Sequence, residues 1–356
     1  MQNPRTILPP KLIFAKKTLY ATQQNIYALD ATTGEIRQTY FFDGITSPGI
    51  MQDILYINVT SRARGTIQAI RVSDETVLWS YPTERSSIDP PTVTPEAVYI
   101  VTSQGILHSL GANDGILRWR YDHGDPDPAI FPAPTIADDV VFFTIKVNPP
   151  YAQSLVALSA KDGTPLWKIY LSSTISFPTV VVDNIIYVSC NDGSCLAFRA
   201  IDGSLLWQRY VHGRPCSSPT VVNGIVYIAF AMETRVPLYA LSAKDGSIVW
   251  RQTVKISTER GNVTRPTVVN SSLYIGTNDG SLLAYSIEDG ALLWRYQTKG
   301  QLLSQPIVAD GIVYIGVNDG CVYALRADDG NLLWQTFVST ALSMSLEVGI
   351  QQTEEK

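Results

Sequence analysis

The residues best suited to bind a ligand are charged side chains in segments rich in turn-forming residues. Arg214, Arg265 and Lys299 could donate hydrogen bonds to an anionic group, and Asp125 and Asp127 could act as ligands or as a base. Such charges would form a mixed-charge mouth for a small anion or a peptide. The alternative is a solvated rim, because charged loop residues are usually exposed to water. The full candidate set is Arg85, Asp89, His123, Asp125, Asp127, Arg214, Arg260, Arg265 and Lys299.

No spacing of histidine, cysteine or acidic residues matches a metal site or a catalytic motif. The three His and four Cys show no pairing typical of zinc ligands. A Ser-His-Asp triad stays an unsupported alternative, since no G-x-S-x-G sequence is present. The Asn-Asp-Gly segments lack the further acidic positions of a calcium loop, so hairpin turns explain them better. We predict no metal site and no catalytic residue, and His108 fits a structural position in a strand.

Two of the cysteines flank one predicted turn. Cys190 and Cys195 stand on either side of Asn191–Ser194. A cross-strand disulfide and two buried free thiols are both compatible with this spacing.

These candidates must be positioned by a repeat that runs through the whole chain. A small residue, Asp-Gly and three further residues precede six of the seven Trp, and the copy before Trp79 has Asp-Glu in place of Asp-Gly. The Trp-to-Trp steps are 40, 48, 40, 43, 44 and 40 residues, and Gln38 replaces the Trp in an eighth, degenerate copy. A period of about 40 residues with four strand-like segments is typical of a β-propeller. The predicted docking residues are Trp79, Trp119, Trp167, Trp207, Trp250, Trp294 and Trp334.

Two further positions recur in each copy and predict how neighbouring blades pack. An aromatic residue in the second strand indicates a core position between blades: Tyr20, Tyr56, Tyr99, Phe142, Tyr187, Tyr227, Tyr274 and Tyr314. A small residue recurs in the third strand, and we expect the indole to lie over the small side chain of an adjacent blade. These small residues are Ala28, Ala69, Ser109, Ala157, Ala197, Ala240, Ala284 and Ala324.

The first copy lacks the Pro-led strand that opens the other seven. That strand fits the rim of a central channel, because proline is tolerated at a strand start or on an edge strand. The strand-like tail Ser339–Ile350 falls where the missing strand is needed, so we predict that it completes the N-terminal blade. The prediction is one all-β domain, 1–356, an eight-bladed propeller of four-stranded antiparallel blades. The predicted blades are 18–42 plus 339–350, 48–82, 91–121, 134–170, 178–210, 219–253, 266–297 and 306–337.

The longer connections are all predicted on one face of the ring. Turns between strands one and two, and between three and four, are short and share the other face. Length variation on one face of a repeat protein usually marks its binding face. The variable segments are Ser61–Arg64, Tyr121–Ala133, Lys146–Gln153, Ala231–Val236 and Thr253–Arg265.

Composition excludes several classes of partner. A net charge of −5 argues against nucleic acid, and no apolar run approaches the roughly 20 residues of a membrane span. The N-terminal residues MQNPRTILPPKLIF lack the apolar segment of a signal peptide, so the compartment stays open. We expect a monomer.

The repeat resembles that of the pyrroloquinoline-quinone-like (PQQ-like) propeller family, over residues 18 to 350. The best copy reads PIVADGIVYIGVNDGCVYALRADDGNLLW, Pro306 to Trp334. The resemblance implies one of two activities: a binding propeller of outer-membrane assembly or of sensing, or a quinoprotein that oxidises alcohols or sugars with PQQ and Ca²⁺. The enzymes of the family carry an adjacent Cys pair and a Trp that stacks on the quinone. Here no two cysteines are adjacent and every Trp is used in the repeat.

We therefore expect a non-catalytic scaffold without a cofactor. Its partner would be a protein or peptide, or a small ligand at the channel mouth. The resemblance implies an extracytoplasmic location. The quinoprotein is the alternative, and a hydrolase or lyase at the channel mouth ranks last.

Overall fold

The structure is a computed structural model whose regular elements are all β-strands. It describes residues 11–15, 17–22, 25–40, 48–61, 64–83, 90–102, 105–123, 132–146, 153–232, 235–257, 261–302 and 304–338. In these ranges no helix is long and apolar enough to cross a membrane.

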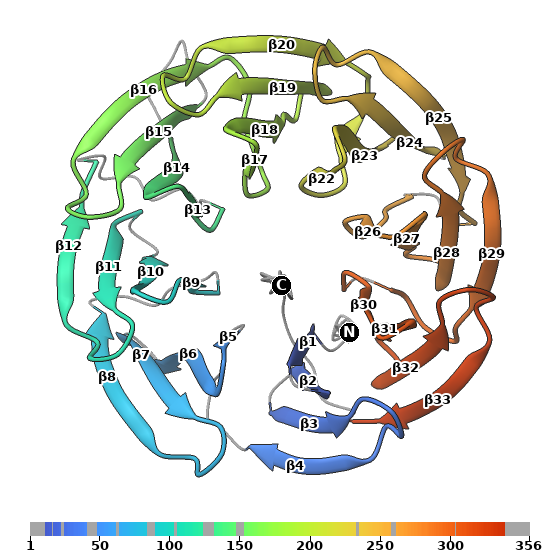
Figure 1. Ribbon diagram of the computed structural model, residues 1–356, viewed down its shortest axis with the longest axis horizontal. Helices are drawn as coiled ribbons and strands as arrows, with labels where there is room; N and C mark the ends of the chain where they lie inside the picture. Colours follow the sequence, from blue (N-terminus) through green and yellow to red (C-terminus); the bar gives the residue numbers. More distant parts are fainter. Residues whose placement is uncertain are drawn as a thin grey trace, which may run out of the picture.

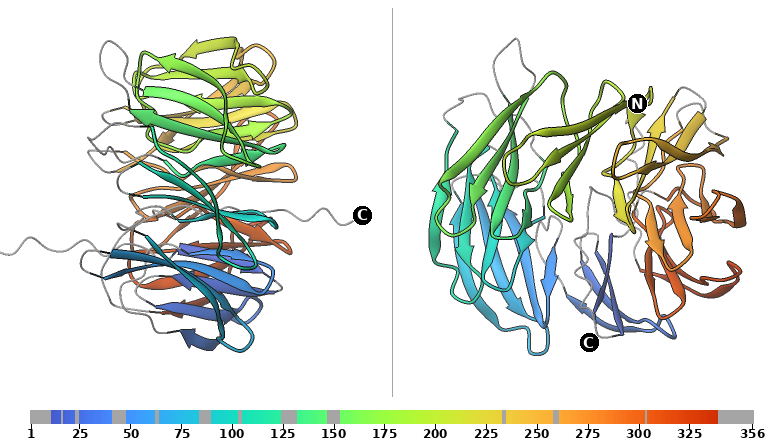
Figure 2. Two further views of the ribbon diagram at one scale, coloured as in Figure 1. Left: turned by 90° about the vertical axis from the view of Figure 1, so that its left-hand side faces the viewer. Right: turned by 45° about the horizontal axis from the view of Figure 1, so that its top comes forward.

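Eight antiparallel sheets stand side by side around a central channel (Figure 1). The first strand of each sheet lines the channel and the last lies at the circumference, and Figure 2 shows the ring from the side. This confirms the predicted eight-bladed, all-β propeller. The predicted Pro-led strands occupy the channel side of seven blades, where a strand has a free edge that tolerates proline.

Blades 1 to 4 take their strands from the first half of the chain. Blade 1 consists of β1 (Lys11–Ala15), β2 (Thr18–Thr22), β3 (Ile26–Asp30) and β4 (Ile36–Tyr40). Blade 2 consists of β5 (Gly49–Met51), β6 (Ile54–Ser61), β7 (Arg64–Arg71) and β8 (Val77–Thr83). Blade 3 consists of β9 (Thr92–Val93), β10 (Ala97–Val101), β11 (Leu107–Gly111) and β12 (Leu117–Tyr121). Blade 4 consists of β13 (Thr135–Ala137), β14 (Val140–Lys146), β15 (Gln153–Ser159) and β16 (Pro165–Leu171).

Blades 5 to 8 follow in the second half, and blade 6 has one additional short strand. Blade 5 consists of β17 (Val180–Val182), β18 (Ile185–Ser189), β19 (Ser194–Arg199) and β20 (Leu205–Tyr210). Blade 6 consists of β21 (Arg214–Pro215), β22 (Thr220–Val222), β23 (Ile225–Ala231), β24 (Arg235–Ser242) and β25 (Ile248–Lys255). Blade 7 consists of β26 (Thr267–Val269), β27 (Ser272–Gly276), β28 (Ser281–Ser286) and β29 (Leu292–Gln297). Blade 8 consists of β30 (Ile307–Ala309), β31 (Ile312–Gly316), β32 (Cys321–Arg326) and β33 (Leu332–Phe337).

The innermost strand of blade 1 comes from the N-terminus, which corrects the predicted closure. β1 pairs with β2 over its whole length, from Lys11 opposite Thr22 to Ala15 opposite Thr18. The place predicted for Ser339–Ile350 is thus taken by the chain's own N-terminal segment, and residues 339–350 lie outside the described residues. The turn contains Lys17 at φ 61°, without Asp or Gly, so its sequence does not indicate a hairpin.

At seven of the eight junctions, the Trp of one blade locks that blade to the next. The indole N–H donates to a backbone carbonyl of the following blade at 2.8 to 3.1 Å. The ring lies flat on the Gly of that blade's Asp-Gly turn, where an added Cβ would come within 2.5 to 2.9 Å of the indole. The Gly residues also adopt positive φ, so other residue types there would be both strained and obstructed. The paired glycines are Gly34, Gly115, Gly163, Gly203, Gly246, Gly290 and Gly330.

The recurrent small residue lies in the same blade as the Trp, not in the neighbouring one as predicted. Ala197 stands between Tyr187 and Trp207 in the register of β18, β19 and β20, and the other Trp-bearing blades repeat this row. The ring centroids of Tyr187 and Trp207 are 6.1 Å apart. Because the middle strand offers only a methyl group, the two rings can meet across it.

Ring closure uses the same lock as the other Trp-bearing junctions. Trp334 of blade 8 donates to the Ala31 carbonyl of blade 1 at 3.1 Å, and the Tyr314 hydroxyl donates to the same oxygen at 3.0 Å. Thr336 donates to the Gly34 carbonyl at 2.7 Å. Blade 8 is thus joined to blade 1 by side chains that dock onto a turn of blade 1.

The junction between blades 1 and 2 replaces both halves of the lock. Gln38 takes the Trp position, and Glu75, at φ 58°, takes the Gly position. The Gln38 amide donates to the Glu75 carboxylate. Tyr40 donates its hydroxyl to the Val72 carbonyl at 3.2 Å, at the position that accepts an indole N–H elsewhere. A side chain at position 75 is possible because no indole covers it.

We expect Trp207→Ala to lower the free energy of unfolding by about 3–5 kcal/mol, because it empties a buried junction. Trp207 is 7% exposed and its N–H donates to the Ala243 carbonyl at 2.8 Å. Chemical unfolding followed by circular dichroism measures the loss. Gln38→Ala is the matched control at the same repeat position and should cost about 1 kcal/mol or less. Equal losses in both variants would contradict the docking role.

We expect Gln38→Trp and Glu75→Gly to be strongly coupled. Trp at position 38 alone would collide with the Cβ of Glu75, whereas both changes together rebuild the lock found at seven other junctions. The double variant should unfold at a higher temperature than the wild type, with a coupling energy of about 0.5–3 kcal/mol in a double-mutant cycle. Additive effects of the two substitutions would show that the indole and the Gly do not form one unit.

Candidate partner-binding face

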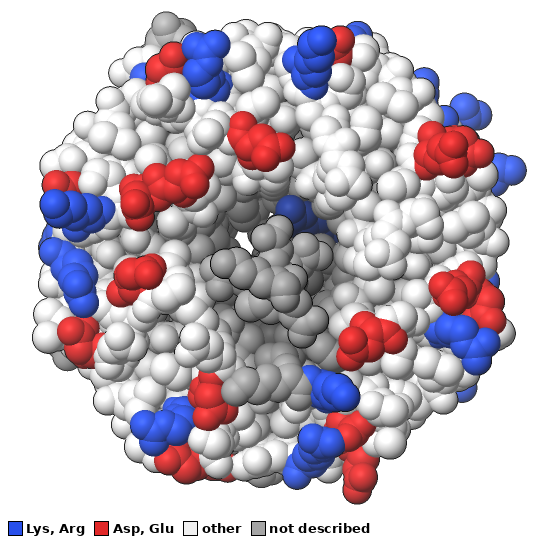
Figure 3. Space-filling view, viewed as in Figure 1, with Lys and Arg blue, Asp and Glu red and all other residues white. Residues whose placement is uncertain are grey.

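The ring has two chemically different faces. The turn face carries the turns between strands one and two and between three and four. Figure 3 shows this face, with acidic side chains around the channel. In the outer turns, between strands three and four, Asp carboxylates pair with Arg, as in Arg199–Asp202 at 3.1 Å. The acidic residues of the inner turns are Asp53, Glu96, Asp138, Asp139, Asp183 and Asp310.

The loop face carries the turns between strands two and three and the connections between blades. Four predicted site residues are described there: His123, Arg214, Arg265 and Lys299. They belong to the connections that follow blades 3, 5, 6 and 7, so the structure distributes them around the ring and does not gather them at one point. The other predicted residues lie outside the described residues: Arg85, Asp89, Asp125, Asp127 and Arg260.

Arg265 holds the most defined position of the four. It is half-buried directly before Pro266, and its Nε donates to Thr220 Oγ1 of the inner strand β22 at 3.3 Å. Arg214 is exposed in β21, opposite Ala231. Lys299 is exposed and acts on Cys321: burial raises the pKa of that thiol, and the Lys299 charge partly opposes the rise.

Hydroxyl groups link the inner strands around the channel. Thr220 Oγ1 donates to the Pro266 carbonyl and Thr267 Oγ1 to the Pro306 carbonyl, both at 2.6 Å. Ser218 donates to the Pro178 carbonyl at 2.9 Å. The proline that precedes the inner strand of blades 5, 7 and 8 thus accepts a bond from a neighbouring blade. These hydrogen bonds fix the starts of the inner strands, where the connections of the loop face end.

The Asn-Asp-Gly segments are hairpin turns, as predicted, and they also hold the connections between blades. In blade 8 the Asn318 N–H donates to the Gln301 carbonyl at 3.1 Å, and its side-chain oxygen accepts the Gln301 N–H at 2.6 Å. The Gly320 carbonyl accepts the N–H of Val338 at 2.9 Å. Blades 5 and 7 repeat both backbone bonds through Asn191-Asp192-Gly193 and Asn278-Asp279-Gly280.

A pair of cations on the loop face was missed by sequence reasoning. Arg235, at the start of β24, stands directly opposite Lys255, at the end of β25, and both are exposed. Like charges directly opposite each other destabilise an antiparallel pair. Arg214 follows blade 5 and lies on β21 of the same sheet. The pair could be found only from the strand register, because the two residues are twenty positions apart in the chain.

The four cysteines and His108 are buried in the blades. All four Cys are buried and free, so Cys190 and Cys195 form no disulfide. Burial raises the pKa of the Cys190 thiol to about 12. His108 is buried, and its Nδ1 lies 3.1 Å from the Tyr81 hydroxyl, as expected for a structural residue. The described residues hold no group of three or more His, Cys, Asp or Glu suited to a metal ion.

The geometry defines a Trp-docked propeller, and sequence comparison gives its family. Residues 22–147, 132–263 and 214–353 match the family described as outer membrane protein assembly factor BamB, so the chain belongs to that family. The outer membrane protein assembly factor BamB of Yersinia pestis is 24% identical over 287 residues, which are 74% of this chain and 70% of that protein.

Two solved structures show how far the fold is shared. BamB from Moraxella catarrhalis superposes with a TM-score of 0.68 at 18% identity, over 92% of this chain and 97% of that one. The quinohemoprotein alcohol dehydrogenase from Comamonas testosteroni has a TM-score of 0.68 at 12% identity, over 98% of this chain and 77% of that one. At these identities the likeness is one of fold.

Asp279 ties the connection after blade 6 to the Asn-Asp-Gly turn of blade 7. Its carboxylate accepts the N–H and the hydroxyl of Ser257, both at 2.9 Å, and the hydroxyl of Ser281 at 3.1 Å. Thr277 donates a further bond. Burial would raise the pKa of Asp279, but these hydrogen bonds outweigh it and lower the pKa to about 2. Ser257 follows Lys255, the last residue of β25, by two residues.

We expect Asp279→Asn to destabilise the protein by about 1–3 kcal/mol at pH 7, because an amide replaces a carboxylate that accepts four hydrogen bonds. A lowered folded-state pKa means that the carboxylate stabilises the fold above the unfolded value near 4. That contribution is lost as the pH falls toward 2, so the difference from wild type should shrink below pH 4. Unfolding at pH 7 and pH 3 measures it.

Asp192→Asn is the matched control, at the same turn position of blade 5. The Asp192 carboxylate accepts the N–H and the hydroxyl of Ser194, both within its own turn. Its substitution should cost less at pH 7. A larger loss for Asp192→Asn, or a pH-independent loss for Asp279→Asn, would contradict the assignment.

Proposed function

We propose that this propeller is a non-catalytic scaffold in outer-membrane protein assembly and that it binds an acidic segment of a partner protein on its loop face. Membership of the BamB family supports the assembly role. It also supports an extracytoplasmic location. The scaffold acts as a monomer, which offers the loop face to one partner.

The use of the Trp residues favours binding over quinone chemistry. Holding a flat, anionic quinone requires an aromatic stacking surface, and the cofactor supplies the redox chemistry. All seven Trp of the chain donate to a neighbouring blade and lie on a Gly, so none is left to stack on a ligand in the channel. The similarity to an alcohol dehydrogenase therefore concerns the scaffold, because sites and not folds carry function.

The cation pair Arg235 and Lys255 is the observation that carries the choice of partner. Two exposed cations in direct cross-strand opposition cost stability in the isolated protein. An acidic segment placed over them would remove this repulsion and add charge-assisted hydrogen bonds. Arg214 and Arg265 lie in the connections on either side of blade 6. Complementary charge of this kind sets specificity and association rate more than affinity.

The test is charge reversal on the two faces. Arg235→Glu with Lys255→Glu should reduce co-purification of a subunit of the outer-membrane protein insertion machinery from cells by at least tenfold. Lys161→Glu with Lys244→Glu makes the same charge change in exposed turns of the turn face and should leave recovery unchanged. Quantitative mass spectrometry measures recovery. Equal recovery with both double variants, or no such subunit with the wild type, would overturn the proposal.

A second arm addresses the quinoprotein alternative. The purified protein is titrated with PQQ and Ca²⁺ while Trp fluorescence and dye reduction with alcohols and aldoses are followed. We expect neither saturable binding nor turnover. Binding below about 1 µM, which corresponds to about −8 kcal/mol, together with substrate-dependent dye reduction would replace the scaffold with an oxidoreductase.

A further inference from the structure

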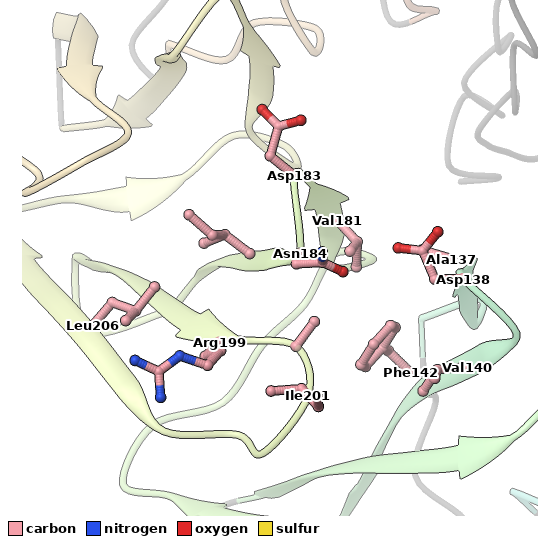
Figure 4. A pocket seen from close by; sticks show the side chains of 12 residues that line it. Ala137, Asp138, Val140, Phe142, Val181, Asp183, Asn184, Arg199, Ile201 and Leu206 are labelled. Carbon is pink, nitrogen blue, oxygen red and sulfur yellow. The ribbon is translucent and has the colours of Figure 1, made fainter.

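A cavity opens on the turn face between blades 4 and 5, away from the loop face. Its volume is about 580 Å³, within the range of ligand-binding pockets. Apolar side chains from both blades line it, including Val140 and Phe142 from blade 4 and Val181, Ile185 and Leu206 from blade 5. Figure 4 shows Phe142 and Ile201 at this cavity, with Asp138 and Asp183 also on its lining.

The junction departs from the repeat at Phe142. The other seven blades have Tyr at this position. At the junction of blades 7 and 8 the Tyr274 hydroxyl donates to the Ala327 carbonyl at 3.2 Å, beside the Trp294 N–H at 2.9 Å. At this junction the Ala200 carbonyl accepts the Trp167 N–H at 2.9 Å, and Phe142 has no hydroxyl to add. The wall of the cavity is therefore more apolar than the corresponding wall between blades 7 and 8.

Ile201 is a second residue that makes this junction more apolar than the repeat. It follows Ala200 in the turn before Trp207 and is 80% exposed at the edge of the cavity. The equivalent residues in the other blades are all polar or charged: Thr32, Ser73, Asn113, Lys161, Lys244, Glu288 and Asp328. Leu205 and Leu206 continue the apolar surface, 53% and 39% exposed. A partner that covers this apolar surface and the adjacent apolar cavity removes both from water, which favours binding.

Acidic and basic residues lie on opposite sides of the cavity. Asp138 and Asp183 occupy the first position of the two-residue turns of blades 4 and 5, on the side nearer the channel. Asp139 follows directly in the first of these turns and is exposed. Arg199 lies on the opposite side, where Asp202 holds it at 3.1 Å. A cationic group placed beside the channel would face acidic residues in both turns.

We propose that this cavity binds a segment of a partner protein that presents a large apolar side chain next to Lys or Arg. The apolar side chain fills the hollow over Phe142 and Ile201, and the cation faces Asp138 and Asp183. The exposure of Ile201 favours a side chain that projects from a protein over a free small molecule, since small ligands are mostly enclosed by their sites. The inference concerns the face opposite to the proposed loop-face partner and does not depend on it.

The experiment uses three synthetic peptides and methyl-labelled protein. The peptides carry Lys-Leu-Lys, Lys-Ser-Lys or Glu-Leu-Glu between Gly-Ser segments, and the Ile methyl resonances of the full chain are followed by NMR. The Lys-Leu-Lys peptide should shift the Ile201 and Ile185 methyl resonances saturably. The other two should bind at least tenfold more weakly. Equal binding of Lys-Ser-Lys would show attraction by charge alone and overturn the proposal, as would shifts confined to the loop face.

Matched variants separate the cavity from general charge effects. Ile201→Lys and Asp183→Asn should each weaken Lys-Leu-Lys binding at least fivefold. Asn113→Lys and Asp310→Asn make the same changes at equivalent turn positions of blades 3 and 8 and should leave binding unchanged. All four lie in exposed turns, where the repeat itself contains Lys or Asn. Unchanged affinity in Ile201→Lys would overturn the proposal.

Isoamylamine, a free apolar cation, is the final probe. It should bind much more weakly than the peptide. Affinity equal to that of the peptide would assign the cavity to small amphiphilic cations and overturn the protein partner.

Discussion

The fold depends on the contact between an indole and a glycine of the next blade. The contact needs a turn whose Gly has positive φ and no Cβ, because an added atom would come within 2.9 Å of the ring or closer. It needs a small residue beside the Trp, so that the aromatic residue of strand two can support the indole from within its own blade. Asp-Gly, Ala, Tyr and Trp therefore recur together, because each is a condition for the same contact.

The junction of blades 1 and 2 shows that this dependence is reciprocal. Where Gln38 replaces the indole, Glu75 replaces the Gly, and Tyr40 takes over the Val72 carbonyl. The two positions have changed together although they lie in different blades. A flat hydrophobic contact has been exchanged for hydrogen bonds in a partly exposed place, where such bonds contribute little net stability.

Much of the fold could be predicted because the indole contact leaves a strong mark in the sequence. The spacing of Trp79 to Trp334 predicted the number of blades, and Asp-Gly predicted their turns. The role of Ala197 was misassigned, because periodicity shows that residues recur and not which neighbours they touch. β1 was missed because its turn contains Lys17 in place of Asn, Asp or Gly.

The candidate site was harder to predict for a physical reason. Arg214, Arg265 and Lys299 were identified as charges in connections, but Arg235 and Lys255 are brought together only by the register of β24 and β25. Likewise, the cavity beside Ile201 requires two blades to be placed against each other. Both proposed binding surfaces lie where residues depart from the repeat, and the effect of such a departure depends on neighbours that only the structure shows.

Ring closure has a consequence for folding. Most locks join residues 33 to 41 positions apart, whereas Trp334 and Ala31 are 303 positions apart. For a flexible chain this difference adds about 2 kcal/mol of closure entropy. We therefore expect the other blades to assemble first along the chain and to hold the two end blades in position. During synthesis the Asp30–Gly34 turn must then wait, uncovered, until almost the whole chain has emerged. Hydrogen exchange during refolding would contradict this order if the closing junction were protected as early as the others.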